Sequence, residues 1–593
     1  MINRRKQVYR ENRAVMAFVI SLGVFIFVIT CWNLGKLNQI CVLNDEFGYW
    51  GTAAYFAGYD WTGLSGTSPY YGFGIAPFYA LLFKVFKDVT IIYKGAIVLN
   101  AFMLVAAFFL SLSCCKKMFP RMADFYRILF CTFLTLYPNN LVQSQIAWTE
   151  TILYLWFWVC CYMIISIYEK PRRYKAVLYG AWLLYGMMIH QRVLGVICAG
   201  VVIILFLKII NRIDWKFFML FLGTVVISFV LFYVIKGYLN DNFWVSISDT
   251  IASKNNMSGQ VKKIEKIFSI EGLVDFFYEV CGQAFYLIVS TCFLVFGFLF
   301  EGGKRIVQIL KSLMKKKKIV CGKYGVVVIF VFIAFVATFL ISTISTAGLT
   351  NRGDTLLYGR YNEFLIGPVL LIGLHAFYTA KQKWQTFAVV TGIGVCIAYV
   401  VNHVFANHYF SAFYCTNCVG VATSFSESAY YNAGTYSAFV KVMLAVFLVL
   451  LLISSRFADK IMYVLGGVCI LTMLWIPAAE YNNENTYQLQ QNFSENVVDV
   501  VEFIEGEKAE ETIYYVADDW GADAFQREIS DRGIKYIQFY LYDKKIDIQG
   551  FHGLETGKEL CIVRKESWCY WNMFEKYDLV YDNDQYGVFR SSM

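Results

Sequence analysis

Long apolar segments recur along most of this chain, and polar connections, most of them short, separate them. A membrane-spanning helix needs about 20 mostly apolar residues to cross the hydrocarbon core. We identify thirteen such segments, which are residues 14–34, 91–113, 128–145, 149–168, 176–190, 193–209, 217–236, 281–300, 325–347, 364–380, 386–402, 437–454 and 461–478. The pattern predicts an α-helical membrane bundle of about thirteen transmembrane helices over residues 1–478. The count is open at two short hairpins, 128–168 and 176–209.

Composition supports this class of protein. Of the 593 residues, 58% are hydrophobic and only 16% are charged, which excludes an ordinary soluble globular chain. The first apolar segment is long and lacks a small-residue cleavage site. We therefore expect it to remain as a membrane anchor and not to be removed as a signal peptide.

Basic residues fall in every second connection of the predicted bundle. They precede the first segment and recur at 114–127, 169–175, 208–216, 301–324, 381–384 and 455–460. By the positive-inside rule, these connections and the N-terminus are cytoplasmic in a multi-pass protein of the plasma membrane. The net charge of +9 follows from this asymmetry, so no nucleic-acid partner is needed to explain it. The Lys315–Lys318 run suits a topology determinant or a contact with membrane lipid headgroups.

An odd number of spans places residues 479–593 on the external side. This region is polar, and its segments 513–516, 536–541, 560–563 and 579–581 are typical of short strands. Residues 495–510 and 521–533 favour helices. We predict a small extracytoplasmic α/β domain with no recognisable catalytic motif. For Cys415 and Cys418 in an external loop, a local disulfide or free thiols are favoured over a zinc site.

The first external loop, residues 35–90, carries adjacent carboxylates directly after the first span. Asp45 and Glu46 lie in an aromatic and glycine-rich stretch, and residues 46–58 and 75–87 suit helices lying in the interface. Acidic residues at a membrane boundary are costly and are often functional. A solvated loop with an aromatic belt is the alternative. Other charged residues at the same face favour a site.

Three other candidate residues, Glu150, His190 and Arg192, lie at short external turns. Glu150 begins the span after the turn at 137–140, where a carboxylate favoured by the helix dipole is the alternative interpretation. His190 and Arg192 form the brief turn between the fifth and sixth spans. We expect these groups at the same membrane face as Asp45.

Arg360 and Tyr361 lie at the external start of the tenth span, against the positive-inside trend. An arginine there needs an anion or an acidic partner. Its planar guanidinium suits bidentate contact with a phosphate. Snorkelling, or a salt bridge to Asp354 or Glu363, is the alternative.

The acidic pair after the first span, the interfacial helices, about thirteen spans and a C-terminal external domain together resemble the GT-C superfamily of membrane glycosyltransferases. The resemblance covers about residues 14–480 and is nearest to the protein O-mannosyltransferase and aminoarabinose-transferase-like group. Gly359-Arg360-Tyr361, followed by Gly367-Pro368, and the His190-Gln-Arg192 turn are similar to elements of bacterial members.

The resemblance implies transfer of a sugar from a polyprenyl-phosphate donor to an envelope glycan, lipid or protein on the external face, with inversion. It places the catalytic carboxylate at Asp45, with Glu46 and Glu150 as further candidates. Donor-phosphate binding falls to Arg360, Tyr361, Arg192 and His190. The acidic pair could also support a divalent cation, and the metal requirement is unknown from sequence.

Two other functions remain open at this point. A polytopic transporter or a lipid or polysaccharide flippase also has many spans, but typically shows internal repeats and charges near the bilayer midplane. We find no convincing repeat between the halves, and the notable charges cluster at one face. A non-catalytic scaffold for polymer assembly is the third option.

The charge pattern makes a direct topological prediction. Lys315–Lys318 should be cytoplasmic and residues 479–593 external, because basic residues are retained on the inner side. Cysteine-accessibility labelling in intact cells measures this. Labelling of cysteines placed at 315–318 from outside would contradict the assignment.

Overall fold

The computed structural model describes most of the membrane region and part of the C-terminal region. The described residues are 2–36, 44–58, 71–86, 89–243, 264–265, 267–291, 293–348, 352–379, 383–410, 417–422, 496, 499–500, 502–504, 506–507, 513–517, 537–541, 560–565, 570–574 and 577–591. The predicted spans 437–454 and 461–478 and the predicted helix 521–533 lie outside these ranges. So does the predicted domain boundary at 478–479.

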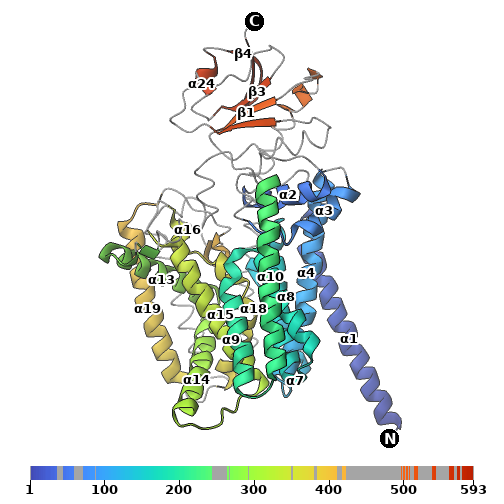
Figure 1. Cartoon of the computed structure of the whole chain (residues 1–593), viewed down its shortest axis with the longest axis vertical. Coiled ribbons are helices and arrows are strands. Elements are labelled where there is room, and N and C mark those ends of the chain that lie inside the picture. The colour runs from blue at the N-terminus through green and yellow to red at the C-terminus, as the bar shows by residue number, and fades with distance from the viewer. Residues whose placement is uncertain are drawn as a thin grey trace.

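Helices dominate the described part of the membrane region (Figure 1). The longer ones are α1 (Ile2–Thr30), α4 (Val89–Met118), α7 (Glu150–Glu169), α8 (Arg173–Ile189), α9 (Leu194–Ile209), α10 (Trp215–Asn242), α13 (Ile270–Ser290), α14 (Leu294–Met314), α15 (Lys323–Thr346), α18 (Ile366–Thr379) and α19 (Lys383–Asn407). Among the residues described, seven helices are long and apolar enough to cross a bilayer. They lie in α1, α4, α7, α10, α13 and α15, and in the segment Gln191–Ile209. The prediction of a helical membrane bundle is confirmed, whereas the number of spans stays a prediction.

Two predicted spans differ from the helices observed. Residues 128–145 form α5 (Asp124–Thr135) and α6 (Pro138–Ser144), separated by a break. Pro138 lacks an N–H and clashes with the preceding turn, so a helix cannot pass through it without distortion. Residues 281–300 span the end of α13 and the start of α14, and Phe293 between them has a φ of 65°. Helix α14 then extends into the predicted 301–324 loop.

The helix α7 connects two polar ends of the bundle. Its 20 residues correspond to about 30 Å, the thickness of a bilayer core. At its last residue, Glu169 forms ion pairs with Lys117 at the end of α4 and with Lys323 at the start of α15. These contacts place basic connections of the chain together at one end. In Figure 1, the connection between α14 and α15 lies at the same end of the bundle as the N-terminus.

The first loop forms two helices at the opposite end. These are α2 (Asn44–Ala57) and α3 (Ala76–Val85), close to the predicted 46–58 and 75–87. Trp50 of α2 stacks on Tyr79 of α3, with ring centroids 4.7 Å apart, and both side chains are fully buried. In Figure 1, α2, α3 and the short helix α16 (Gly353–Leu356) occupy the same end, whereas the N-terminus lies at the other.

The C-terminal region forms a mixed five-stranded sheet in the order β2-β1-β3-β5-β4. Its strands are β1 (Ile513–Ala517), β2 (Ile537–Leu541), β3 (Leu560–Arg564), β4 (Tyr577–Asp582) and β5 (Tyr586–Ser591). The first three are parallel, and β5 pairs antiparallel with both β3 and β4. Four strands were predicted from sequence and β5 was missed. The fold class, a helical membrane bundle with a small α/β domain, is confirmed.

Candidate functional site: a buried carboxylate between two arginines

Glu150 is the centre of a buried ionic cluster at the end of the bundle that carries α2. It is the first residue of α7. One carboxylate oxygen accepts a hydrogen bond from Nε of Arg360 at 2.6 Å, and the other is paired with Nη2 of Arg192. Relative exposure is only 5% for Glu150, 3% for Arg192 and 6% for Arg360. Charges buried this deeply need partners, and each guanidinium finds one in the same carboxylate.

The turn after α8 presents Arg192 to this cluster. The turn forms the short helix η3 (Gln191–Val193), and Nδ1 of His190 accepts the backbone N–H of Arg192 at 3.1 Å. Burial lowers the pKa of His190 well below its usual range, and the two arginines lower it further, so the ring is neutral and can accept this bond. The guanidinium of Arg192 also lies 5.4 Å from the ring centroid of Tyr361. His190 therefore positions Arg192.

The connection before α18 presents Arg360. This residue begins the short helix α17 (Arg360–Glu363), and its guanidinium lies 3.8 Å from the ring centroid of Trp148, a cation–π distance. Gly359 is required by close packing, because a Cβ there would sit 1.9 Å from a ring carbon of Tyr286. The backbone N–H of Gly359 donates to the carbonyl of Asn417 at 3.0 Å. The backbone just before Arg360 is thus held by distant elements.

For Arg360, a salt bridge to Asp354 or Glu363 was predicted from sequence as an alternative to phosphate binding. Asp354 pairs instead with Arg352 at 2.7 Å and accepts from Nδ2 of Asn417 at 2.9 Å. Glu363 accepts a hydrogen bond from the hydroxyl of Tyr286. Arg360 does have an acidic partner, but that partner is Glu150, more than 200 residues away in sequence.

Glu46 fastens α2 to the chain just before Glu150. Its carboxylate is fully buried and accepts from the backbone N–H of Ala147 at 2.7 Å and from the hydroxyl of Tyr93 at 2.9 Å. Thr149 donates to the hydroxyl of Tyr49 at 2.9 Å. A carboxylate buried among neutral donors is suited to anchoring α2.

Asp45 lies in the first turn of α2, one residue before this anchor. Its side chain is outside what the structure describes, so its assignment as the catalytic carboxylate stays a prediction. The backbone places it at the end of the bundle where Glu150, Arg192 and Arg360 meet.

Residues 71–74 of the first loop pack on the turn that carries Arg192. The N–H of Gly74 donates to the carbonyl of Met188 at 2.6 Å. A Cβ on Gly72 would lie 2.1 Å from the carbonyl oxygen of Ile189, so only glycine permits this approach. The aromatic rings of Tyr71 and Tyr361 lie 6.5 Å and 6.2 Å from the ring of His190. The first loop is therefore part of the site.

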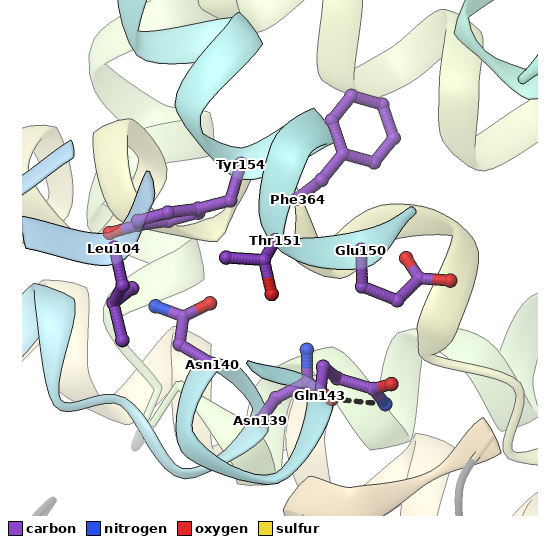
Figure 2. A pocket seen from close by; sticks show the side chains of 8 residues that line it. All are labelled: Leu104, Asn139, Asn140, Gln143, Glu150, Thr151, Tyr154 and Phe364. Atoms are coloured by element: carbon purple, nitrogen blue, oxygen red, sulfur yellow. Dashed lines mark hydrogen bonds between the residues drawn. The ribbon is translucent and has the colours of Figure 1, made fainter. Parts of the chain in front are cut away.

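A small polar cavity adjoins Glu150 (Figure 2). It is lined by Leu104, Asn139, Asn140, Gln143, Glu150, Thr151, Tyr154 and Phe364, and it encloses space for about one water molecule. Figure 2 shows the hydroxyl of Thr151 pointing into this space. Among the described residues that hydroxyl has no hydrogen-bond partner. The cavity suits a single small polar group beside the ionic cluster.

The cluster of Glu150, Arg192 and Arg360 carries a formal charge of +1. Burial raises the pKa of nearby Glu363 to about 8, so this carboxyl is protonated at neutral pH and adds no charge. Among the described residues, Nε and Nη1 of Arg192 are buried without a hydrogen-bond partner. A buried site with net positive charge and unused guanidinium N–H groups can bind an anion.

Several residues of the site were not identified from sequence. Tyr93, Tyr286 and Asn417 carry no motif, and each reaches the site through contacts with residues more than 45 positions away. Trp148 precedes the predicted span 149–168, and no role was predicted for it. For a metal, the part of the chain that the structure describes contains no group of three or more His, Cys, Asp or Glu side chains suited to hold one. Cys415 lies outside the described residues.

Comparisons with known proteins address the fold. No protein-family model matches the sequence, and no curated protein matches it significantly. The structure is similar to that of ArnT from Cupriavidus metallidurans bound to undecaprenyl phosphate, with a TM-score of 0.50, 11% identity and 97% of each chain covered. The apo state of the same protein gives a TM-score of 0.49, 10% identity and 98% coverage of each chain.

An oligosaccharyltransferase from Archaeoglobus fulgidus is more distantly similar. It has a TM-score of 0.39 and 10% identity, with 88% of this chain and 64% of that chain covered. We base the assignment on the first structure, because it matches over nearly the whole length of both chains. ArnT is an aminoarabinose transferase of the GT-C class. The chain therefore has the fold of the GT-C membrane glycosyltransferases.

Proposed function

We propose that this protein is an integral membrane glycosyltransferase that moves a sugar from a polyprenyl-phosphate donor to a cell-envelope acceptor. One observation carries the proposal. Arg192 and Arg360, from separate connections, meet at Glu150 in a buried site at the end of the bundle that carries the first loop. A pair of guanidinium groups at a membrane boundary is suited to a lipid phosphate.

The two arginines bind the donor phosphate in this proposal. The unused Nε and Nη1 of Arg192 donate to phosphate oxygens, and the guanidinium of Arg360 lies in the same cluster, 3.8 Å from the ring centroid of Trp148. Positive charge in a buried site also stabilises the phosphate as it leaves with the electron pair of the sugar–oxygen bond. Tyr361 and His190 keep Arg192 in place.

The acceptor hydroxyl attacks the anomeric carbon opposite the lipid phosphate. A new carbon–oxygen bond to the acceptor forms as the bond to phosphate breaks, and the configuration inverts. The Asp45 carboxylate takes the proton of the acceptor hydroxyl. Glu46 and Glu150 act as positioning residues, because the described contacts engage Glu46 with Ala147 and Tyr93 and engage both oxygens of Glu150 with arginines.

Two further observations support the proposal. One solved structure with a similar fold, that of ArnT, was determined with undecaprenyl phosphate bound. In addition, the Lys117–Glu169–Lys323 contacts and the α14–α15 connection lie at the opposite end of the bundle from α2. Basic connections are retained in the cytoplasm, so this arrangement favours an external location for the site.

Asp45→Asn tests the enzymatic role. The substitution keeps the size of the side chain and removes its charge, so sugar transfer should fall by roughly 10²–10⁴-fold, as expected for a lost general base. Mass spectrometry of envelope glycans, in cells with the wild-type protein, the variant or neither, measures transfer and names the sugar and acceptor. Asp241→Asn, an exposed carboxylate near the end of α10, is the matched control. Normal glycans in cells with a folded Asp45→Asn protein would contradict the role of Asp45.

Substitutions of Arg360 test the phosphate site. Arg360→Lys keeps the charge but loses the fork of N–H groups, so undecaprenyl phosphate should bind more weakly, and Arg360→Ala should weaken binding by about tenfold or more. Binding is measured by native mass spectrometry of purified protein in nanodiscs. Arg305→Lys is the control, because Arg305 makes a similar arginine–glutamate pair with Glu301. If Arg360 is only structural, the folded variants will retain wild-type affinity.

A further inference from the structure

The ionic cluster contains a carboxylate that a simple phosphate site does not need. Two guanidinium groups alone would present a charge of +2, yet Glu150 accepts from both of them and reduces the formal charge to +1. This costs affinity for any anion, because a carboxylate near a bound phosphate repels it. A role for Glu150 in catalysis by proton transfer is disfavoured, since both of its carboxylate oxygens are engaged by arginines.

The two lipid phosphates of the proposed reaction differ in charge. The donor is a phosphodiester with one negative charge. The carrier released after sugar transfer is a phosphomonoester, whose second ionisation has a pKa near 6, so it carries about −1.5 to −2 at neutral pH. A cluster of charge +2 would therefore favour the released carrier over the donor, and the product would inhibit its own enzyme.

We propose that Glu150 is a specificity-determining residue that sets the cluster to +1, so that it holds the singly charged donor and releases the doubly charged carrier. This inference rests on the proposed function, because it assumes that Arg192 and Arg360 bind the lipid phosphate. It assigns to Glu150 control of the relative affinity for phosphodiester and phosphomonoester.

Glu150 determines the relative affinity for phosphodiester and phosphomonoester in this proposal, because the following neighbouring groups are neutral. Among the described residues, Glu363 is a second carboxyl near the cluster, and it is protonated at neutral pH because burial raises its pKa to about 8. His190 is neutral for the same physical reason, burial. Tyr49 is fully buried and its pKa is raised, so it is neutral as well. The low exposure of the cluster leaves little water to screen the carboxylate.

Glu150→Gln is the direct test, because glutamine keeps the shape and one acceptor oxygen while removing the charge. The probes are undecaprenyl phosphate and its methyl ester, a singly charged phosphodiester, bound to the purified full-length protein in nanodiscs at about pH 7, where Glu363 is protonated. We expect the affinity of the variant for undecaprenyl phosphate to exceed that of the wild type by about tenfold or more. Its affinity for the methyl ester should increase by a smaller factor. Product release should slow correspondingly.

Glu169→Gln is the matched control. Glu169 is the last residue of the same helix and likewise bridges two cations, Lys117 and Lys323, but at the opposite end of the bundle. The Glu169→Gln substitution changes the net charge of the protein by the same amount as Glu150→Gln. It should leave the affinities for undecaprenyl phosphate and for its methyl ester unchanged. Equal or weaker binding of undecaprenyl phosphate by folded Glu150→Gln would overturn the inference.

The wild-type protein provides a second test that does not depend on folding of the variant. A cluster of +1 should bind the monophosphate and its methyl ester within about threefold of each other. A preference of about tenfold or more for the monophosphate would contradict the role of Glu150. If Arg360→Ala leaves undecaprenyl phosphate binding unchanged, the phosphate site itself is refuted. If Arg360→Ala weakens binding while Glu150→Gln does not strengthen it, only the inference about Glu150 fails.

Discussion

The ionic contacts of Glu150 are the constraint on which the end of this bundle depends. They join the start of α7 to the turn after α8 and to the connection before α18, three elements far apart in sequence. Removing one partner from a buried ion pair typically costs about 3–5 kcal/mol, because the remaining charge stays buried without compensation. The three elements are therefore held in one arrangement, and the proposed anion site requires all three to be in place.

The first loop is tied to this arrangement by neutral contacts. Glu46 fastens α2 to Ala147, three residues before Glu150, and Gly74 fastens the segment before α3 to the end of α8, four residues before Arg192. Asp45 is adjacent in sequence to the first of these contacts. The loop that carries the proposed general base and the turns that carry the proposed phosphate ligands are thus built as one unit, which suits a reaction that needs both groups at a single sugar.

Sequence patterns predicted the helical membrane bundle, the two helices of the first loop and four of the five strands, because apolar periodicity and strand propensity are local properties. They also assigned Glu150, Arg192 and Arg360 to one site. They did not reveal that Glu150 pairs with both arginines, since a pairing across 42 and 210 positions leaves no local signal. The division of 281–300 between α13 and α14 was missed because both sides of the break are apolar. The sequence placed a turn at 137–140, where α5 ends and α6 begins, although the predicted span 128–145 ran across it.

The location of a bound lipid phosphate tests the central claim most directly. Electron cryo-microscopy of the full-length protein in nanodiscs with undecaprenyl phosphate would show the phosphorus relative to the cluster. The account predicts phosphate oxygens within hydrogen-bond distance of both Arg192 and Arg360, at the end of the bundle that carries α2. A headgroup bound elsewhere, with both arginines still paired with Glu150, would contradict it.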